Sequence, residues 1–182
     1  MLKSRQGWKP YGRGYSCGRP GASNGFPIPV TRLEQYYFDL YVLEVCITTL
    51  ERGGTTSRPD TYQFLSSVEA WGLPKYPDRT VILPPDANLL QEVTAFIHSN
   101  AHHFREANCW LGTWINPQTS HCYLDITGIY TRLEEARREA IALCHRAQRR
   151  IVALYDFKRE RTVYLWNEGL LRTSVFHSSP TR

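Results

Sequence analysis

Residues 109–126 read CWLGTWINPQTSHCYLDI and carry the clearest structural signal in the chain. Two runs rich in aromatic and β-branched residues flank a polar turn, in which Pro117 takes the position where its fixed φ is favoured. The pattern predicts two adjacent antiparallel strands over 109–115 and 120–126. If Pro117 and Gln118 form the centre of the loop, Trp114 lies opposite His121, and the pairs Gly112–Tyr123 and Trp110–Asp125 follow.

Strand alternation divides this hairpin into two faces. The better core face by composition holds Cys109, Leu111, Thr113, Cys122, Leu124 and Ile126. The other face is aromatic and polar, is opened by Gly112, and holds Trp110, Trp114, His121, Tyr123 and Asp125. Such a surface suits a platform for a ligand or a peptide. Two alternatives stay open: a helix or the N-terminal subdomain covers this face as a second core, or a one-residue slip at Ser120 exchanges the faces of one strand.

Helical patterns stand on both sides of the hairpin. Asp86 is a good N-cap for a helix that ends near residues 100–104, with an apolar stripe from Leu89 to Ile97. A capping box at Thr131–Glu134 opens a second helix, whose inner side includes Ala136 and Ala140. Residues 151–155 and 162–166 predict a second hairpin. The expected fold is therefore α+β, an antiparallel sheet from two hairpins with helices packed on one face.

Motifs over residues 86–166 resemble a known pattern. They are Leu111-Gly112-Thr113-Trp114, Asn116-Pro117-Gln118-Thr119, Tyr123-Leu124-Asp125-Ile126, Glu134-Glu135-Ala136 and the run from Arg149 to Asp156. Together they resemble a small uncharacterised α+β domain that recurs in actinobacterial and phage-associated proteins. The resemblance implies a compact module, sometimes attached to other domains, and brings no catalytic residue. This chain departs from the pattern at Ser120, where the family has glycine.

Residues 31–85 predict a mainly helical N-terminal subdomain. A capping box at Thr31–Glu34 begins the first helix, and Gly53-Gly54 ends it. Its apolar residues recur at helical intervals, at Leu33, Tyr37, Leu40, Leu43 or Glu44, Ile47 and Leu50. A strand is the alternative, because Tyr36–Thr48 is rich in β-branched and aromatic residues. A second short helix is expected from Pro59 or Asp60 to Trp71, and a strand over 79–83.

The chain is basic, with 22 Lys and Arg against 17 Asp and Glu among 182 residues. Residues 1–30 contain no acidic residue and many glycines and prolines, which predicts a flexible basic arm. Residues 86–182 form the second predicted domain, with a short C-terminal tail. A nucleic-acid-binding role would use Lys3, Arg5, Lys9, Arg13 and Arg19 together with Arg146, Arg149 and Arg150. The alternative is a solvated surface, since the basic residues around the last helix and hairpin are interleaved with Glu134, Glu135, Glu139, Asp156 and Glu160.

Other classes of site have weaker patterns. No apolar run approaches the roughly 18 residues that span a bilayer, so we expect no membrane partner. The five cysteines are an odd number at irregular spacings, which favours reduced thiols, a cytoplasmic location and no activating cation beside the buried ones. His98 and His102 stand four residues apart, but the ligand runs of structural zinc sites are missing, so no metal and no cofactor is expected.

No acid and base pair or activated nucleophile emerges from these patterns, and an enzyme is the less favoured class. His121 and Cys122, for example, are neighbours on a strand and therefore point to opposite faces. The leading prediction is a non-catalytic binding or interaction module that recognises a protein or a small ligand through the aromatic hairpin face. An origin in a phage or another mobile element is a further expectation. The alternative is a nucleic-acid-binding accessory protein, and the oligomeric state stays open.

Overall fold

The computed structural model describes residues 31–147 and 150–166. The basic arm expected over 1–30 and the tail after residue 166 lie outside the described residues. The described elements follow in the order α1 (Arg32–Arg52), β1 (Gly54–Arg58), β2 (Gln63–Phe64), β3 (Trp71–Pro74), η1 (Pro77–Arg79), β4 (Val81–Leu83), α2 (Leu89–Ser99), η2 (His103–Arg105), β5 (Trp110–Ile115), β6 (Cys122–Tyr130), α3 (Leu133–Ala147), β7 (Ala153–Asp156) and β8 (Arg161–Tyr164). The fold is thus α+β, as the sequence predicts.

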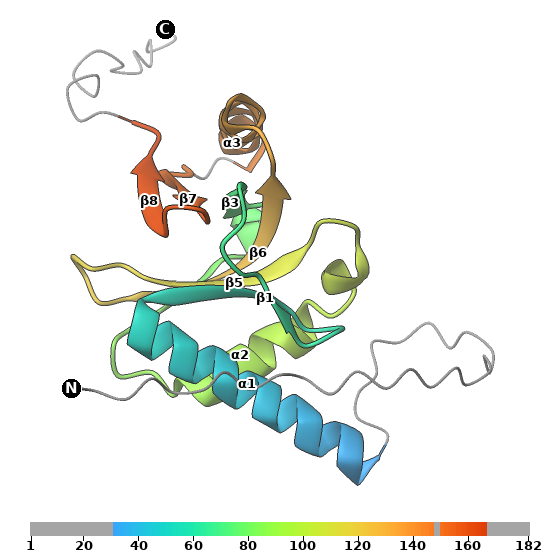
Figure 1. Ribbon diagram of the computed structural model, residues 1–182. Coiled ribbons are helices and arrows are strands. Elements are labelled where there is room, and N and C mark those ends of the chain that lie inside the picture. Colours follow the sequence, from blue (N-terminus) through green and yellow to red (C-terminus); the bar gives the residue numbers. More distant parts are fainter. Residues whose placement is uncertain (1–30, 148–149, 167–182) are drawn as a thin grey trace, which may run out of the picture.

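The strands form one antiparallel sheet in the order β2-β1-β5-β6-β3-β7-β8, and β4 pairs with β6. The long strand β6 joins the two halves of this sheet. Its first part pairs with β5 on one edge and β4 on the other, and its last part pairs with β3. The sheet curls along β6, so that β7 and β8 rise above β1 and β5 (Figure 1). This curl creates a concave face.

Helices α1 and α2 pack beneath β1, β5 and β6 around the larger of two cores (Figure 1). The predicted capping box of α1 is confirmed, because Thr31 and Glu34 each accept the backbone N–H of the other. The predicted stop is also confirmed, with Gly53 in the left-handed region at φ 79°. Phe38, Val42 and Val45 of α1 are buried against the sheet. The chain turns at Gly53, so β1 begins directly after α1 and runs antiparallel to β5.

Helix α3 packs against β3 and β7 in a second core. The residues buried there include Ala136, Ala140 and Leu143 from α3, with Leu73 and Leu154 from the strands. The inner side predicted for this helix is confirmed. Neither α3 nor any other helix of the described ranges combines the length and apolar character that a membrane span requires.

The prediction of a mainly helical subdomain over 31–85 is wrong beyond α1. Residues 54–83 contribute four strands to the common sheet, and the stretch expected as a helix, from Pro59 or Asp60 to Trp71, instead holds the turn after β1, the strand β2 and the first residue of β3. Tyr62 supports the tight turn between β1 and β2 at φ 57°. The apolar spacing there fitted a helix, but β2 pairs with β1, and β3 pairs with residues of β6 more than 50 positions later, and these pairings supply the backbone hydrogen bonds.

Two local predictions need correction. The N-cap of α2 is Asn88, not Asp86, because the side-chain oxygen of Asn88 accepts the N–H of Gln91 at 3.3 Å. The β5–β6 register differs by two residues from the prediction, since Trp114 lies opposite Tyr123 rather than His121. The loop is longer than expected and spans residues 116–121, and Ser120 within it adopts the left-handed region at φ 58°. A shift of two residues keeps every side chain on its predicted face.

The apolar residues of α1 that the sequence singles out do not face the core. Leu33, Leu40 and Ile47 are exposed to solvent, whereas the core takes Phe38, Tyr41, Val42, Val45 and Cys46. Both sides of this helix are apolar. The sheet therefore buries one side and leaves the other uncovered within the described part of the chain.

Candidate functional site

A cavity of about 530 Å³ lies on the concave face of the sheet, and Thr48 and Arg52 at the C-terminal end of α1 also line it. Trp114 of β5 with Tyr123 and Asp125 of β6 line one part of it. Gly72 of β3 and Tyr155 of β7 line another part, where the sheet curls upward (Figure 1). The cavity therefore exists because the two halves of the sheet face one another across the bend.

Alternation along β6 explains which side chains reach the cavity. Tyr123 and Asp125 line it and are partly exposed, while Leu124 and Ile126 between them are completely buried in the first core. Leu111 on β5 is also completely buried. The predicted division into a core face and an aromatic face is thus the one the structure has.

Small residues hold the cavity open. Gly112 lies opposite Asp125, and a Cβ atom added at Gly112 would stand 2.0 Å from Oγ1 of Thr127. A Cβ atom added at Gly72 would stand 2.8 Å from the ring of Phe157. Both separations are far below van der Waals contact. Side chains at these positions would therefore displace residues that line the cavity.

The chemistry of the cavity combines aromatic surface with a carboxylate. The rings of Trp114 and Tyr123 contact each other, with centroids 5.3 Å apart and planes tilted by 48°. The hydroxyl of Thr80 donates a hydrogen bond to Oδ1 of Asp125, which fixes the orientation of that carboxylate. Such an arrangement can cover a flat apolar group and accept hydrogen bonds from a polar one.

The structure brings together three of the five residues predicted on the aromatic face. Trp110 lies on the same sheet face but outside the cavity, and the guanidinium of Arg58 stacks 5.5 Å from its ring centre. His121 also stays outside, with Nδ1 3.0 Å from the carbonyl oxygen of Thr119 in the loop. Arg150, singled out for nucleic acid, lines the cavity and lies 4.9 Å from the ring centre of Trp166. Sequence spacing gave no sign that Arg150 approaches β5 and β6.

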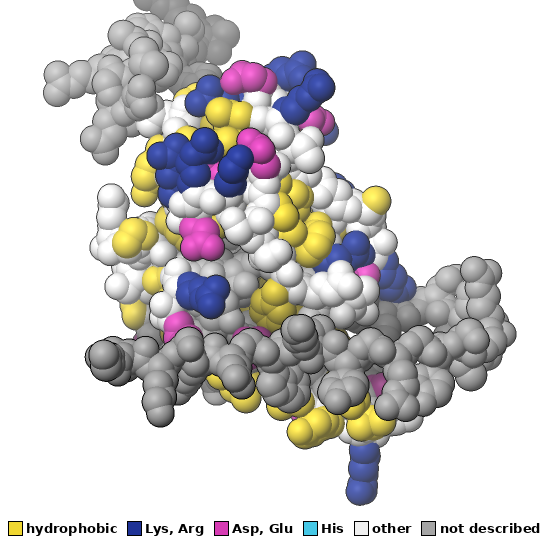
Figure 2. Space-filling model, in the orientation of Figure 1, with side chains coloured by type: hydrophobic (Ala, Val, Ile, Leu, Met, Phe, Trp, Pro, Cys, Tyr) yellow, Lys and Arg dark blue, Asp and Glu magenta, His cyan; other side chains and the backbone are white. Residues whose placement is uncertain are grey.

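The predicted arginine track is only partly described. Arg146 forms a 2.6 Å ion pair with Glu139 on the surface of α3. Lys3, Arg5, Lys9, Arg13, Arg19 and Arg149 lie outside the described residues. Basic and acidic side chains mix over the upper part of the molecule in Figure 2, rather than forming a field of one sign. Nucleic-acid binding stays a prediction.

The two histidines with zinc-like spacing have other neighbours. The ring of His98 packs on Phe38 at a centroid distance of 5.2 Å, and the rings of His102 and His103 lie 3.8 Å apart with their planes tilted by 41°. Within residues 31–147 and 150–166, no group of three or more His, Cys, Asp or Glu side chains is placed to hold a metal ion.

A polar network that the sequence analysis missed joins the segment after β3 to the segment before β5. Glu106 is its centre: one carboxylate oxygen accepts from Tyr76 at 2.5 Å and lies 3.5 Å from Nζ of Lys75, and the other lies 2.7 Å from Nδ1 of His103. The hydrogen bond from Tyr76, together with the His103 hydrogen bond and the positive charge of Lys75, lowers the pKa of Glu106 to about 2. The same bond raises the pKa of Tyr76 to about 12. The network holds Glu106 ionised.

Cys109 lies beside this network, with Sγ 3.1 Å from Nζ of Lys75. The expectation of no cation near the buried cysteines is therefore wrong for Cys109, because folding brings in a lysine 34 residues away. Burial nevertheless raises the pKa of the thiol above its ordinary value, and Cys109 is completely buried. A protonated and inaccessible thiol is a poor nucleophile, so we assign this network to structure.

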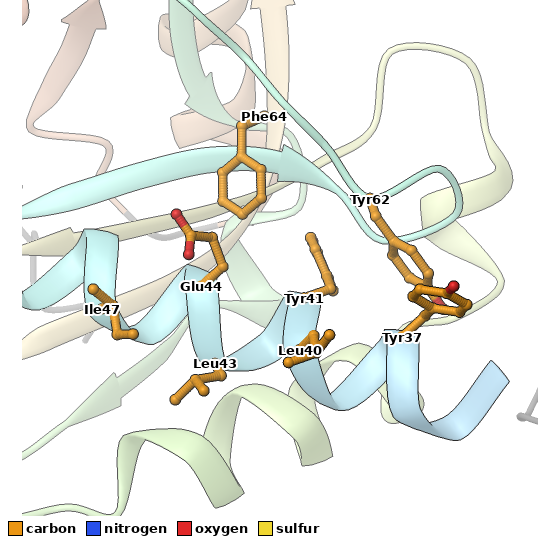
Figure 3. A pocket seen from close by; sticks show the side chains of 8 residues that line it. All are labelled: Tyr37, Leu40, Tyr41, Leu43, Glu44, Ile47, Tyr62 and Phe64. Atoms are coloured by element: carbon orange, nitrogen blue, oxygen red, sulfur yellow. The ribbon is translucent and has the colours of Figure 1, made fainter. Parts of the chain in front are cut away.

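A second depression, of about 390 Å³, lies on the outer side of α1. Figure 3 shows its lining side chains, which come from α1 and from the β1–β2 hairpin: Tyr37, Leu40, Tyr41, Leu43, Glu44, Ile47, Tyr62 and Phe64. Its walls are almost entirely apolar. It offers no group of polar side chains comparable to that of the concave face.

No family model, no curated protein and no solved structure matches this chain. The resemblance of residues 86–166 to an actinobacterial and phage-associated domain therefore stays a prediction.

Proposed function

We propose that the protein is a non-catalytic binding module and that the concave face of its sheet holds a small ligand. The ligand would have a flat apolar body and a hydrogen-bond donor. The observation that carries this proposal is the cavity in which Trp114, Tyr123 and Asp125 meet. The hairpin pattern alone predicted these three residues as binding residues, and the cavity provides a space in which they would contact a ligand.

The shape of the site favours a small ligand over a protein partner. A volume of about 530 Å³ falls within the roughly 300–1,000 Å³ of small-molecule sites. Protein partners more often meet a flatter patch of roughly 800 Å². The walls come from both halves of the curled sheet, so a ligand that fills the cavity would contact β5, β6, β3 and β7 together.

The polar groups suggest which ligands bind best. Asp125 accepts a hydrogen bond from Thr80, and a carboxylate can accept hydrogen bonds from several donors at once. Arg150 and Glu160 also line the cavity, so the polar lining carries both signs of charge. A neutral or singly cationic aromatic compound fits this combination. The aromatic rings supply contact area, and Asp125 supplies orientation.

A matched panel of probes tests the proposal. Ligand-observed NMR would compare aromatic amines, such as tryptamine, with analogues that lack the amine, such as indole. We expect the amines to bind, and we expect Asp125→Asn to reduce their affinity about tenfold, because a charge-assisted hydrogen bond is replaced by a neutral one. Trp114→Ala should weaken the binding of both the amine and the amine-free analogue in each pair.

Trp110 provides the control, since it is an aromatic residue of the same strand outside the cavity. Trp110→Phe should leave probe binding unchanged. Binding that falls equally in the Trp110 and Trp114 variants would contradict a site in the cavity. So would a panel in which no aromatic probe binds at millimolar concentration.

A further inference from the structure

The outer side of α1 carries a regular apolar stripe that nothing in the described part of the chain covers. Its spacing alternates between three and four residues, which is the a and d pattern of a coiled coil, at Leu33, Tyr36, Leu40, Leu43, Ile47 and Leu50. These six side chains are between 41% and 67% exposed. We call them the α1 seam. Hydrophobic side chains are visible where α1 lies, at the lower edge of Figure 2.

We propose that the α1 seam pairs with the same seam of a second copy of this chain, in an antiparallel two-fold dimer. The stripe is self-complementary in this orientation: Leu33 packs against the partner's Leu50, Tyr36 against the partner's Ile47, and Leu40 against the partner's Leu43. Each layer then joins an a position to a d position. A two-fold contact of one patch with itself is the commonest way in which soluble proteins associate.

The area of the seam suits a stable contact. With Tyr37 beside them, seven large side chains of roughly 200 Å² each are about half exposed on this side of α1. Covering them would bury on the order of 700 Å² per copy, near the roughly 800 Å² per partner of a standard interface. An exposed apolar patch of this size is unusual for a monomer.

The charges beside the seam select the antiparallel orientation. A parallel pair would place Asp39 opposite the partner's Glu44 on both sides, and the like charges would repel. An antiparallel pair places Glu44 opposite the partner's Tyr37, whose hydroxyl can donate a hydrogen bond to the carboxylate. Opposed helix dipoles favour the same orientation.

The depression on α1 gives the contact its shape. Leu40, Glu44 and Ile47 form one wall, and Tyr62 with Phe64 of the β1–β2 hairpin form the other (Figure 3). The partner helix would lie along this depression. Because Trp114, Tyr123 and Asp125 lie on the sheet face opposite the core that α1 covers, the dimer would present these parts of its two cavities away from the helix contact.

Sedimentation of the full chain over a concentration series tests the proposal. We expect a dimer at micromolar concentration, and we expect Leu43→Glu to raise its dissociation constant by at least about 100-fold, because a charge would be placed in an apolar seam. Ile141→Glu on α3 is the matched control, since Ile141 is 43% exposed and Leu43 46%. It should leave the dimer intact. If Leu43→Glu does not fold, Leu50→Glu tests the same point at the end of the helix.

Disulfide trapping tests the orientation. Leu40→Cys and Leu43→Cys, each in a background with Cys17→Ser and Cys144→Ala, would be mixed and oxidised, with one of them tagged. The antiparallel pair predicts the mixed 40–43 product. A wild-type monomer at about 100 µM overturns the proposal, as does a dimer that both seam variants leave unchanged. Symmetric 40–40 and 43–43 products overturn the antiparallel geometry.

Discussion

The two cores formed by the described residues differ in the size of the side chains that fill them. The first core, between the sheet and helices α1 and α2, contains Phe38, Phe96 and Phe104 with long aliphatic residues. The second core, between β3, β7 and α3, relies on Ala136 and Ala140 at the centre of its helix. Alanines let α3 lie close to the strands but remove little apolar surface from water.

The difference indicates how stability is distributed. Regions with few buried apolar contacts open at a lower free energy than the rest of a fold. We therefore expect α3, β7 and β8 to open before β5 and β6 do. The concave cavity lies between these two regions, so the more stable region provides Trp114 and Asp125, and the less stable one provides Tyr155 and Arg150.

Truncation in the first core should have the largest effect. Phe104 is completely buried and packs edge to face on Phe96 with centroids 6.2 Å apart. Phe104→Ala should lower the free energy of unfolding by about 4 kcal/mol, measured by urea denaturation, because it removes an aromatic ring and leaves a cavity. Ile82→Ala is the control, since Ile82 is 44% exposed, and should change stability by about 0.5 kcal/mol at most. Similar losses in both variants would contradict the assignment of the core.

Truncation in the second core should be smaller and local. Leu154→Ala should lower the free energy of opening by about 2–3 kcal/mol. Hydrogen exchange should show the loss in the amides of α3, β7 and β8, while those of β5 keep their protection. An equal loss of protection in β5 would mean that the two halves of the sheet unfold as one unit.

The junction between the two halves can be tested at Gly112. Gly112→Ala should cost about 2 kcal/mol, because the added Cβ atom would meet Oγ1 of Thr127 at 2.0 Å. Thr127→Ala in the same chain should recover part of that loss, since it removes the hydroxyl. A double-mutant cycle from denaturation curves measures this coupling. Additive losses would show that the two side chains do not compete for the same space.

The polar network between the halves should give the smallest effect, and one that depends on pH. The pKa of Glu106 falls from an ordinary 4.5 to about 2 on folding. Its stabilisation is therefore complete above about pH 4.5 and is lost as the pH falls toward 2. Because Glu106 is 38% exposed, solvent screening should keep this contribution near 1 kcal/mol.

Denaturation curves at pH 5, 4 and 3 measure this contribution of Glu106 to the free energy of unfolding. Glu106→Gln should flatten the pH dependence relative to the wild type, and Tyr76→Phe should flatten it in part, because it removes the 2.5 Å hydrogen bond. Parallel curves for the wild type and Glu106→Gln would contradict the lowered pKa.

Local sequence patterns were sufficient for prediction where neighbouring residues satisfy one another's hydrogen bonds, or where side chains alternate strictly between two faces of a strand. The capping box at Thr31, the stop at Gly53 and the inner side of α3 were predicted from neighbouring residues alone. The faces of β5 and β6 were predicted even though the register was wrong, since a two-residue shift preserves alternation. Three of the residues at the cavity followed from that alternation.

Contacts between distant segments decided the rest. The strands over 54–83, the approach of Arg150 to the cavity and the Lys75–Glu106 network all depend on pairings that no local spacing encodes. Helix α1 shows the reason most clearly. The sequence determined that it is a helix with apolar residues on both sides, with Leu40 and Ile47 on one and Val42 and Val45 on the other. Only the sheet, by binding one side, decided which of them is core and which is surface.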